Sequence, residues 1–461
     1  MVTEAVLERT GARAGSARGG RRRYLPAGAV AAAVAANAGA IVWLWAHGGN
    51  LQHLSRTGDL LTSLGRLTGL LSAYLALVQV LLLARMPWLE RAIGFDRLSR
   101  WHRWNGHATL DLVLAHVVLT VWGYALLDRY TLPHELSTML GGGIYPGMIT
   151  ATVGTALIVI VVVSSIVVVR RRLRYEWWYA VHLAAYAGIA LAWFHQIPTG
   201  NELVLDTVAA DYWRSLYVAT LALLLVFRFA RPLAHAFRYR LRVDEVVEEG
   251  PGVVSLRIRG RGLHRLGAEA GQFFLWRFLD RRRFWAAHPF SLSEAPDGRS
   301  LRITVKALGD FSSRLAEVRP GTRVLAEGPF GTFTAAARRR PRVALVAGGI
   351  GVTPVRALLE ELDGDVVVLY RVVDERDLVL ADELDELAAE RGAVVHHVVG
   401  DHRLPGNERL LSPEHLRELV PDLPRRDVFV CGPPAMTEAT RRNLVAAGVP
   451  RRHIHEEQFA L

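Results

Sequence analysis

The chain has 461 residues, of which 51% are hydrophobic and 55 are Lys or Arg, and its formal net charge is +11. This composition fits a membrane domain joined to a charged soluble part better than one globular body. The basic residues flank apolar runs, as the positive-inside rule predicts, so the charge does not indicate nucleic-acid binding. The single cysteine, Cys431, excludes an intrachain disulfide and a four-thiolate iron–sulfur cluster.

Residues 1–25 are rich in Arg, Ala and Gly, and we expect them to form a disordered basic arm. Six apolar segments follow, at 26–46, 60–84, 102–126, 147–169, 176–197 and 211–230. The fourth contains 23 uncharged residues, which can cross a bilayer core of about 30 Å. The first segment is too long for a cleaved signal peptide, and five more spans follow it.

Most basic loop residues fall on one side of these six spans. They are Arg21, Arg22 and Arg23 before the first span, Arg85, Arg91, Arg97 and Arg100 after the second, RRRLR at 170–174 after the fourth, and Arg231, Arg238 and Arg240 after the sixth. The other loops hold few, mainly Arg56 and Arg129. The positive-inside rule therefore predicts a multi-pass protein of the plasma membrane with both termini and the soluble part in the cytoplasm.

The sequence changes character after residue 240. Short runs of alternating polarity, broken by Gly and Pro, predict a small antiparallel β-barrel over 240–336. Strand–helix–strand patterns then predict a parallel α/β domain over 340–461. The expected architecture is thus a six-helix transmembrane bundle over 26–232, followed by these two domains.

Four histidines lie in the third and fifth apolar segments, where an ionisable side chain is costly and marks function. His102 and His116 are 14 residues apart, so on an ideal helix they share a face at depths differing by about 21 Å. His182 and His195 are 13 residues apart, about 140° short of whole turns, so their helix must be tilted or locally overwound.

Both segments run outward from the cytoplasm, so the histidines align by depth. His102 pairs with His182, and His116 pairs with His195. Two imidazoles facing each other at each depth are what two stacked b-type haems require. The alternative is a set of interhelical hydrogen bonds.

The pattern HRWNG…H on one span and H…H on another resembles the ferric reductase transmembrane family, which includes the NADPH oxidases. The resemblance implies that His102 and His182 bind the inner haem and that His116 and His195 bind the outer one. His107 fits neither pair, and we interpret it as a packing residue or a contact of a haem propionate.

Arg66, in SLGRLTGLL, lies near the outer end of the second span. In the oxidases, an arginine at a similar place lies by the outer haem and the oxygen site; the alternative is snorkelling to the outer headgroups. The oxidases also have a histidine one turn beyond the outer ligand, where this chain has Thr120. This departure favours metal reduction over superoxide formation.

The segment HPFSLSE (288–294) resembles the HPF[ST] flavin motif of the same family and of ferredoxin–NADP reductase-like domains. The resemblance implies that Pro289 and Phe290 shape the isoalloxazine bed, with Ser291 near N5. VKALGDFSSRL (305–315) then opens a helix whose backbone N–H groups suit a pyrophosphate. The alternative is a pair of ordinary turns. The expected FAD-binding residues are His288, Pro289, Phe290, Ser291, Ser293, Lys306, Gly309 and Ser312.

The segment GGIGVTP (348–354) lies between a predicted strand and a predicted helix, where glycines let a phosphate approach the backbone. It lacks the third glycine of GxGxxG but resembles the nicotinamide-dinucleotide site of the reductases. The implied contacts are Gly348, Gly349, Gly351, Thr353 and Pro354.

CGPPAM (431–436) follows the last predicted central strand, at an edge where such sheets bind ligands. In relatives this cysteine, here Cys431, lies by the nicotinamide, with Gly432 and Pro433 beside it; the alternative is a buried structural cysteine. EEQFAL resembles the family's closing E-x-F-x-aromatic pattern, so Phe459 is expected to cover the flavin, although the chain ends at Leu461.

The choice between NADPH and NADH depends on the segment after the domain's second strand. Arg371 and Arg376 in YRVVDERDL favour the 2′-phosphate of NADPH, whereas Asp374 and Glu375 oppose it. We expect NADPH as the donor, with NADH as the alternative.

These motifs predict one electron path, from NAD(P)H through FAD, the inner haem and the outer haem to an extracytoplasmic acceptor. The leading hypothesis is reduction of ferric iron or another metal chelate, with Cys431, Ser291 and Arg66 as catalytic residues. The alternatives are superoxide formation from oxygen, a membrane-anchored flavin reductase without haem, and a haem-bearing sensor. The expected partners are the lipid bilayer, NAD(P)H and the acceptor, without nucleic acid or an obligatory protein partner.

Overall fold

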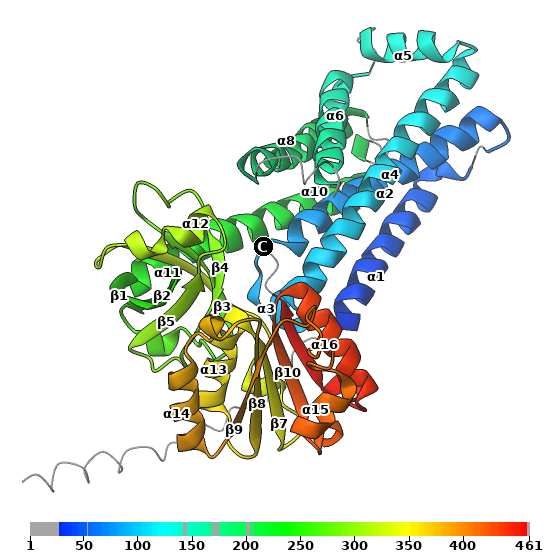
Figure 1. Ribbon diagram of the computed structural model, residues 1–461. Helices are drawn as coiled ribbons and strands as arrows, with labels where there is room; N and C mark the ends of the chain where they lie inside the picture. The colour runs from blue at the N-terminus through cyan, green and yellow to red at the C-terminus, as the bar shows by residue number, and fades with distance from the viewer. Residues whose placement is uncertain are drawn as a thin grey trace, which may run out of the picture.

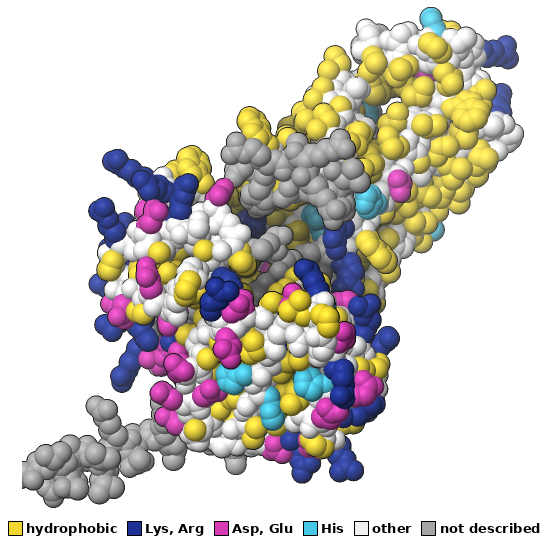
Figure 2. Space-filling view, in the orientation of Figure 1, with side chains coloured by type: hydrophobic (Ala, Val, Ile, Leu, Met, Phe, Trp, Pro, Cys, Tyr) yellow, Lys and Arg dark blue, Asp and Glu magenta, His cyan; other side chains and the backbone are white. Residues whose placement is uncertain are grey.

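The computed structural model describes residues 27–52, 54–141, 145–166, 169, 175–199, 203–204 and 206–458. An extended helical part leads into two β-rich domains that lie next to each other (Figure 1). Figure 2 shows apolar side chains over much of the helical part, whereas charged side chains gather on the two soluble domains. The predicted arm 1–25, the RRRLR loop at 170–174 and Phe459 lie outside the described residues.

Six helices in the described part of the chain are long and apolar enough to cross a membrane. This finding confirms the predicted number of spans and the multi-pass architecture. The helical elements are α1 (Ala27–Trp45), η1 (Ala46–Asn50), α2 (Thr57–Leu82), α3 (Pro87–Ile93), α4 (Phe95–Asp128), α5 (Leu132–Gly141), α6 (Met148–Ser165), α8 (Tyr175–Thr199), α10 (Thr207–Leu224), η2 (Leu225–Ala230) and α11 (Arg231–Tyr239).

The central spans pack as two helix pairs, α2 with α4 and α6 with α8. Polar groups bond across the first pair, where Ser72 donates to the Thr109 carbonyl at 3.0 Å and Asn105 donates to Gln79 Oε1 at 2.8 Å. Such bonds satisfy polar groups that lipid cannot solvate and fix the register of the helices. These hydrogen bonds therefore fix the positions of α2 and α4 relative to each other along the helix axes.

The first soluble domain is built from two antiparallel three-stranded sheets, ordered β1-β2-β5 and β4-β3-β6. Isolated bridges, Arg242 with Arg323 and Leu292 with Ile303, join the two sheets. Alternate side chains, including the fully buried Trp276, fill the space between them. The strands are β1 (Arg242–Gly250), β2 (Val253–Arg259), β3 (Phe273–Phe278), β4 (His288–Ser291), β5 (Ser300–Lys306) and β6 (Val324–Phe330). The predicted antiparallel barrel is confirmed.

The second soluble domain has a five-stranded parallel sheet, ordered β11-β10-β7-β8-β9. Figure 1 shows α13 and α14 on one face and α15 and α16 on the other. The elements are β7 (Val343–Gly348), α13 (Val352–Glu361), β8 (Val366–Val372), α14 (Ala381–Arg391), β9 (Val394–Val399), α15 (Pro413–Leu419), β10 (Asp427–Gly432), α16 (Pro434–Ala446) and β11 (Ile454–Gln458). The predicted parallel α/β domain is also confirmed, and its strand order reverses between β7 and β10, where such sheets bind ligands.

The short helix α3 joins the membrane part to the barrel. Arg85, just before α3, forms an ion pair with Glu327 on β6, and Arg231 on α11 donates to the Gly328 carbonyl at 3.4 Å. Between these groups lies Glu90, which is 5% exposed and whose Oε2 has no hydrogen-bond partner among the described residues. Burial raises the pKa of Glu90 to about 8, although Arg85 and Arg231 act in the opposite direction. The joint therefore holds a carboxyl group that favours its neutral form.

Replacing Glu90 by Gln tests this description of the joint. The pKa of Glu90 is about 8 in the folded protein, against 4.5 for an ordinary glutamate. Between these values the folded state binds a proton that the unfolded chain has released, so the stability of the wild type falls as pH rises. Glu90→Gln cannot titrate, and we expect its advantage in thermal unfolding temperature to grow from about pH 5 to about pH 9. A pH-independent advantage, equal to that of the exposed control Glu248→Gln, would contradict the prediction.

Candidate functional site

The inner histidine pair joins the two helix pairs. His102 on α4 and His182 on α8 face each other with ring centroids 6.1 Å apart and planes tilted by 49°. With metal–nitrogen bonds of about 2 Å and about 1.1 Å from nitrogen to ring centre, two imidazoles on opposite sides of one metal have centroids about 6.3 Å apart. The observed spacing therefore fits two axial ligands of one iron.

The histidines of α4 are oriented by backbone carbonyls of α2. Nδ1 of His102 lies 3.0 Å from the Gln79 carbonyl oxygen, and Nδ1 of His116 lies 2.8 Å from that of Gly65. An Nδ1–H that donates to a carbonyl leaves Nε2 as the available metal ligand. At Gly69 an added Cβ would lie 2.7 Å from Nδ1 of His116, so the bare backbone makes room for this ring.

The histidines of α8 have hydroxyl partners instead. Nδ1 of His182 lies 3.2 Å from Ser165 Oγ, and Nδ1 of His195 lies 3.2 Å from Thr199 Oγ1. The same hydroxyl of Thr199 is 3.4 Å from Nε2 of His195. His195 also lies against the start of α6, where a Cβ added to Gly147 would be 3.0 Å from its Cα. These contacts place His195 beside the start of α6.

The four imidazoles together fit the donor set of two haems. Each Nδ1 is held by its own carbonyl or hydroxyl, so the rings do not serve as hydrogen-bond partners for one another among the described contacts. Neutral imidazole nitrogen suits iron, and partners of this kind fix the tautomer of each ligand. The bonds of His102, His116 and His182 run between helices, and they are compatible with haem ligation through the other ring nitrogen.

Three further residues of the membrane part have distinct surroundings. Nη1 of Arg66 donates to Oδ1 of the buried Asn50 at 3.1 Å, so its guanidinium binds within the bundle. Oγ1 of Thr120 lies 3.4 Å from Nδ1 of His116. The side chain of His107 is exposed. Arg66 and Thr120 are therefore associated with the outer histidine, directly or through the neighbouring Gly65, whereas His107 is not.

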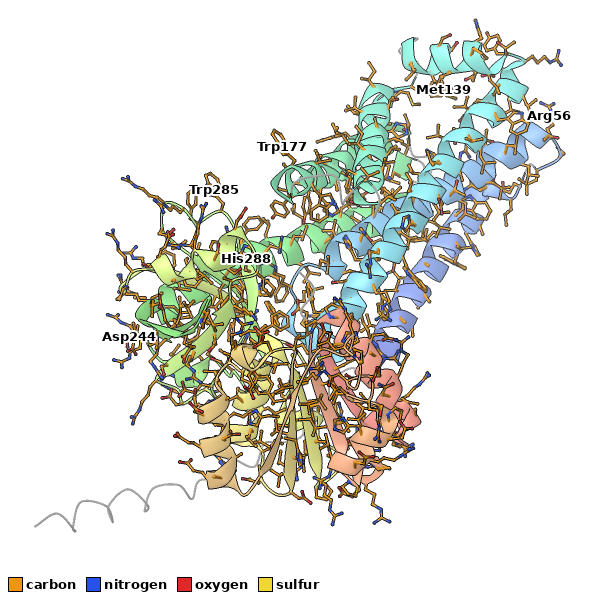
Figure 3. The ribbon with its side chains drawn as sticks, in the orientation of Figure 1. Arg56, Met139, Trp177, Asp244, Trp285 and His288 are labelled. Atoms are coloured by element: carbon orange, nitrogen blue, oxygen red, sulfur yellow. The ribbon has the colours of Figure 1, made fainter. Side chains whose placement is uncertain are left out.

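The predicted flavin motif forms an aromatic surface on β4. His288 stacks on Phe311 with centroids 3.7 Å apart and planes 24° apart, and Phe290 is nearly parallel to both rings. Pro289 between them is exposed, and burial lowers the pKa of His288. Figure 3 labels His288 on the part of the barrel nearest to the helical part. A flat, half-buried aromatic surface at this place suits an isoalloxazine ring.

The other predicted FAD-binding residues are already engaged by the protein. Ser293 is fully buried, and its hydroxyl lies in a network with Arg302 and Thr304 inside the barrel. Lys306 Nζ forms an ion pair with Asp377 at 2.6 Å.

At the loop predicted to bind pyrophosphate, the chain forms only the short helix α12 (Asp310–Ser313). Oγ of Ser312 accepts from the backbone N–H groups of Leu308 and Gly309 at 2.9 and 3.0 Å. This serine hydroxyl thus holds the loop in shape, and it would have to share those N–H groups with a phosphate.

The two predicted nicotinamide loops touch each other at the edge of the parallel sheet. A Cβ added to Gly351 would lie 2.3 Å from the Cys431 carbonyl oxygen, and one added to Gly348 would lie 2.1 Å from Met436 Sδ. Only glycine permits this approach. Thr353 and Pro354 are buried in the first turn of α13, where Thr353 Oγ1 donates to the Ile350 carbonyl at 3.0 Å. The switch point of the sheet thus combines GGIG and CGPP.

Glu457 on β11 connects the two soluble domains, and it was not among the predicted site residues. Ser291 Oγ donates to Glu457 Oε1 at 3.4 Å, and Glu457 is paired in register with Cys431. Burial raises the pKa of the Cys431 thiol, and Glu457 adds to the effect, so this cysteine is a neutral thiol. The Glu of the E-x-F pattern near the C-terminus is the signal that could have identified Glu457.

The two arginines expected to select NADPH have different environments. Arg371 is buried and donates to backbone carbonyls, including that of Val398 at 3.2 Å. Arg376 is exposed and forms an ion pair with Asp374 at 2.8 Å. Hydrogen bonds from the side chain and backbone of Arg376 lower the pKa of Asp374 to about 2. Selection of a 2′-phosphate would therefore depend on Arg376 and on the opening of this ion pair.

Comparison with known protein families gives three matches in chain order. Residues 68–193 match the ferric reductase like transmembrane component, 249–334 match an FAD-binding domain, and 345–442 match the oxidoreductase NAD-binding domain. The matches thus follow the order of a ferric reductase-like transmembrane domain, an FAD-binding domain and an NAD-binding domain, as the sequence motifs predict. These domain families confirm that the soluble part consists of an FAD-binding and an NAD(P)-binding domain.

Two curated relatives match about half of the chain. The ferredoxin reductase component of 3-ketosteroid-9-alpha-monooxygenase from Mycolicibacterium smegmatis is 35% identical over 48% of this chain and 65% of its own length. An NADPH oxidoreductase from Mycobacterium tuberculosis is 29% identical over 50% of this chain and 63% of its own length. The chain thus spans just under two thirds of the length of these relatives.

Solved structures with similar segments are also found. The FAD/NAD-binding domain of nitric oxide dioxygenase from Vibrio cholerae is 26% identical, with a TM-score of 0.40 over 48% of this chain and 98% of that one. A ferredoxin–NADP⁺ reductase from Neisseria gonorrhoeae with bound FAD and NADP is 18% identical, with the same TM-score and the same two coverages.

Single histidine substitutions test the assignment of the haem ligands. His102→Leu and His182→Leu are each expected to remove the same haem and to halve the haem content per chain, because both ligands of a pair are needed. Haem content and the reduced-minus-oxidised absorbance spectrum measure the effect. His107→Leu, which replaces the exposed histidine of α4, is the matched control and is expected to keep both haems. Equal loss from all three variants would contradict the assignment.

Opening the Arg376–Asp374 ion pair tests the choice of nucleotide. Asp374→Asn frees the guanidinium for a 2′-phosphate, so we expect the ratio of kcat/KM for NADPH over NADH to rise about two- to fivefold. Glu375→Gln, which leaves the ion pair in place, is the matched control. An unchanged ratio in Asp374→Asn would exclude Arg376 from phosphate recognition.

Proposed function

We propose that this protein carries electrons from cytoplasmic NAD(P)H through FAD and two b-type haems to ferric iron, or another metal chelate, outside the plasma membrane. The observation that supports it most directly is the 6.1 Å spacing of His102 and His182 across the two helix pairs. A membrane-anchored flavin reductase without haem has no use for imidazoles at this depth, where polar groups are costly.

The cofactors supply the redox chemistry, since FAD takes up two electrons as a hydride and releases them singly, and each haem iron carries one electron. The residues of the protein position the reactants. GGIG and CGPP form the nicotinamide site, and the neutral thiol of Cys431 packs there without becoming a nucleophile. Ser291 and Glu457 join this site to the flavin surface of β4.

The depth of the histidines supports transfer across the bilayer. His102 lies near the end of α4 that adjoins α3 and the barrel, and His116 lies about 21 Å further along the helix axis. The ion pair of Arg85 with Glu327 holds the barrel at the inner end. Arg85 and Arg231, which belong to basic loops, contact the barrel, so the positive-inside rule supports cytoplasmic reductase domains.

Reduction of oxygen to superoxide is the second candidate function, and Arg66 is the residue that favours it. The side chain of Arg66 donates a hydrogen bond to Asn50. Arg66 also follows Gly65 in the chain, and the carbonyl of Gly65 orients His116. A cation so close to the outer pair could stabilise an anionic product of oxygen. Against it, Thr120 occupies the position where the oxidases have a further histidine.

The purified protein in nanodiscs, supplied with NADPH and a ferric chelate, separates the two functions. We expect the chelate to be reduced at similar rates with and without oxygen, and superoxide dismutase to leave the rate unchanged. Strictly oxygen-dependent turnover would contradict metal reduction.

Cys431→Ala provides the internal control for this assay. It is expected to slow haem reduction by NADPH at least about tenfold, because the nicotinamide is less well positioned. Haem reduction by dithionite bypasses the nicotinamide and should stay unchanged. Loss of both reactions would mean that the substitution had damaged the whole protein.

A further inference from the structure

A buried carboxylate lies at the outer end of the membrane part. Glu135 on α5 is 0% exposed, and neither Oε1 nor Oε2 has a hydrogen-bond partner among the described residues. Its neighbour one turn on, Met139, is 4% exposed, so both side chains point from α5 towards the bundle. A buried carboxyl group without a partner is unstable as a bare anion, so it needs a proton or a cation.

The groups around Glu135 are oxygen donors and one imidazole. Burial raises its pKa, Asp128 adds to this, and His134 opposes it. Burial also raises the pKa of Tyr145, and Tyr124, Glu135 and Asp128 act in the same direction. The rings of Tyr124 and Tyr145 are in edge-to-face contact at 5.7 Å. Carboxylate and phenol oxygens are hard donors, which suit hard, multivalent cations.

This group lies between the outside and the outer histidine pair. Figure 1 shows α5 crossing the far end of the bundle between α4 and α6, and Figure 3 labels Met139 there. Tyr145 precedes Gly147 by two residues, and Gly147 packs on the backbone of His195. A cation held by Glu135 would therefore be near the predicted outer haem.

We propose that Glu135, with Tyr124, Tyr145 and Asp128 around it, forms the docking site for the metal cation that this protein reduces. The inference rests on the proposed function and deepens it by placing the substrate. One electron from the outer haem converts Fe³⁺ to Fe²⁺, and NAD(P)H supplies that electron. The carboxylate attracts the product less strongly because its charge is lower, so reduction itself promotes release.

The site differs from a resident metal centre. Nowhere in the described residues do three His, Cys, Asp or Glu side chains converge as a metal cage. A substrate cation that keeps water or part of its chelator needs only a few protein ligands, as this group offers. Transient binding is what turnover requires.

Terbium(III) is a hard cation that cannot be reduced here, and its emission is excited through nearby aromatic rings. With the full-length protein in detergent, we expect saturable terbium luminescence on tyrosine excitation. Glu135→Gln should weaken the affinity at least about tenfold, or 1.4 kcal/mol. Asp211→Asn, which removes an exposed carboxylate at the start of α10, is the matched control and should bind like the wild type. Equal binding by wild type and Glu135→Gln would overturn the proposal and leave Glu135 as a protonated buried acid.

Two further measurements keep the test decisive. Gallium(III) has the charge of Fe³⁺ but is not reduced, so it should displace terbium from the wild type, whereas magnesium at equal concentration should not. If neither cation displaces terbium, the site is contradicted. This result needs only the wild type, so it stands even if Glu135→Gln fails to fold.

In turnover with ferric citrate, Glu135→Gln should raise KM about tenfold while haem reduction by NADPH stays unchanged. An unchanged KM would contradict docking of the substrate at Glu135. Normal terbium binding without any metal reduction would refute the proposed function. It would also refute the role of Glu135 in binding the substrate, and Glu135 would then belong only to a cation site.

Discussion

The cost of placing polar groups in lipid is the constraint on which the membrane part depends. An imidazole at membrane depth needs a partner for each nitrogen, and α2 provides backbone carbonyls for the two histidines of α4. Gly69 leaves space for one of these rings. The hydroxyls of Ser165 and Thr199 do the same for α8. One nitrogen of each ring is thereby engaged, and haem ligation would use the other.

Long-range contacts connect this bundle with the soluble domains. Arg85 and Glu327 fix the barrel at the inner end of the bundle, beside the buried Glu90. Ser291 and Glu457 then bridge the flavin surface and the nicotinamide loops. Each bridge pairs residues from distant parts of the sequence, so the order of the motifs along the chain becomes a spatial order. The proposed electron path follows that order from the nicotinamide loops to the outer histidines.

The two ends of the bundle use buried carboxyl groups in different ways. At the inner end, Glu90 lies among arginines that already pair with the barrel, and burial keeps its proton. At the end remote from the barrel, Glu135 lies near Asp128, which raises its pKa, and His134, which lowers it. Burial disfavours a bare carboxylate at both places. It keeps Glu90 neutral beside the barrel, and we propose that it lets Glu135 bind a cation at the opposite end.

The sequence by itself determined the six spans, the antiparallel and parallel sheets, and the positions of the HPFS, GGIGVTP and CGPP motifs. These features follow from local pattern, because apolar length, alternation and glycine spacing act within a few turns or strands. It also paired His102 with His182, since depth along a helix is a count of residues.

Only the tertiary structure decided which polar side chains are already engaged. It placed Ser293 inside the barrel, joined Lys306 to Asp377, and brought Glu457 beside Ser291. It also buried the side chain of Glu135 on α5. Burial and pairing of this kind depend on which distant segments pack together, and no local pattern in the sequence contains that information.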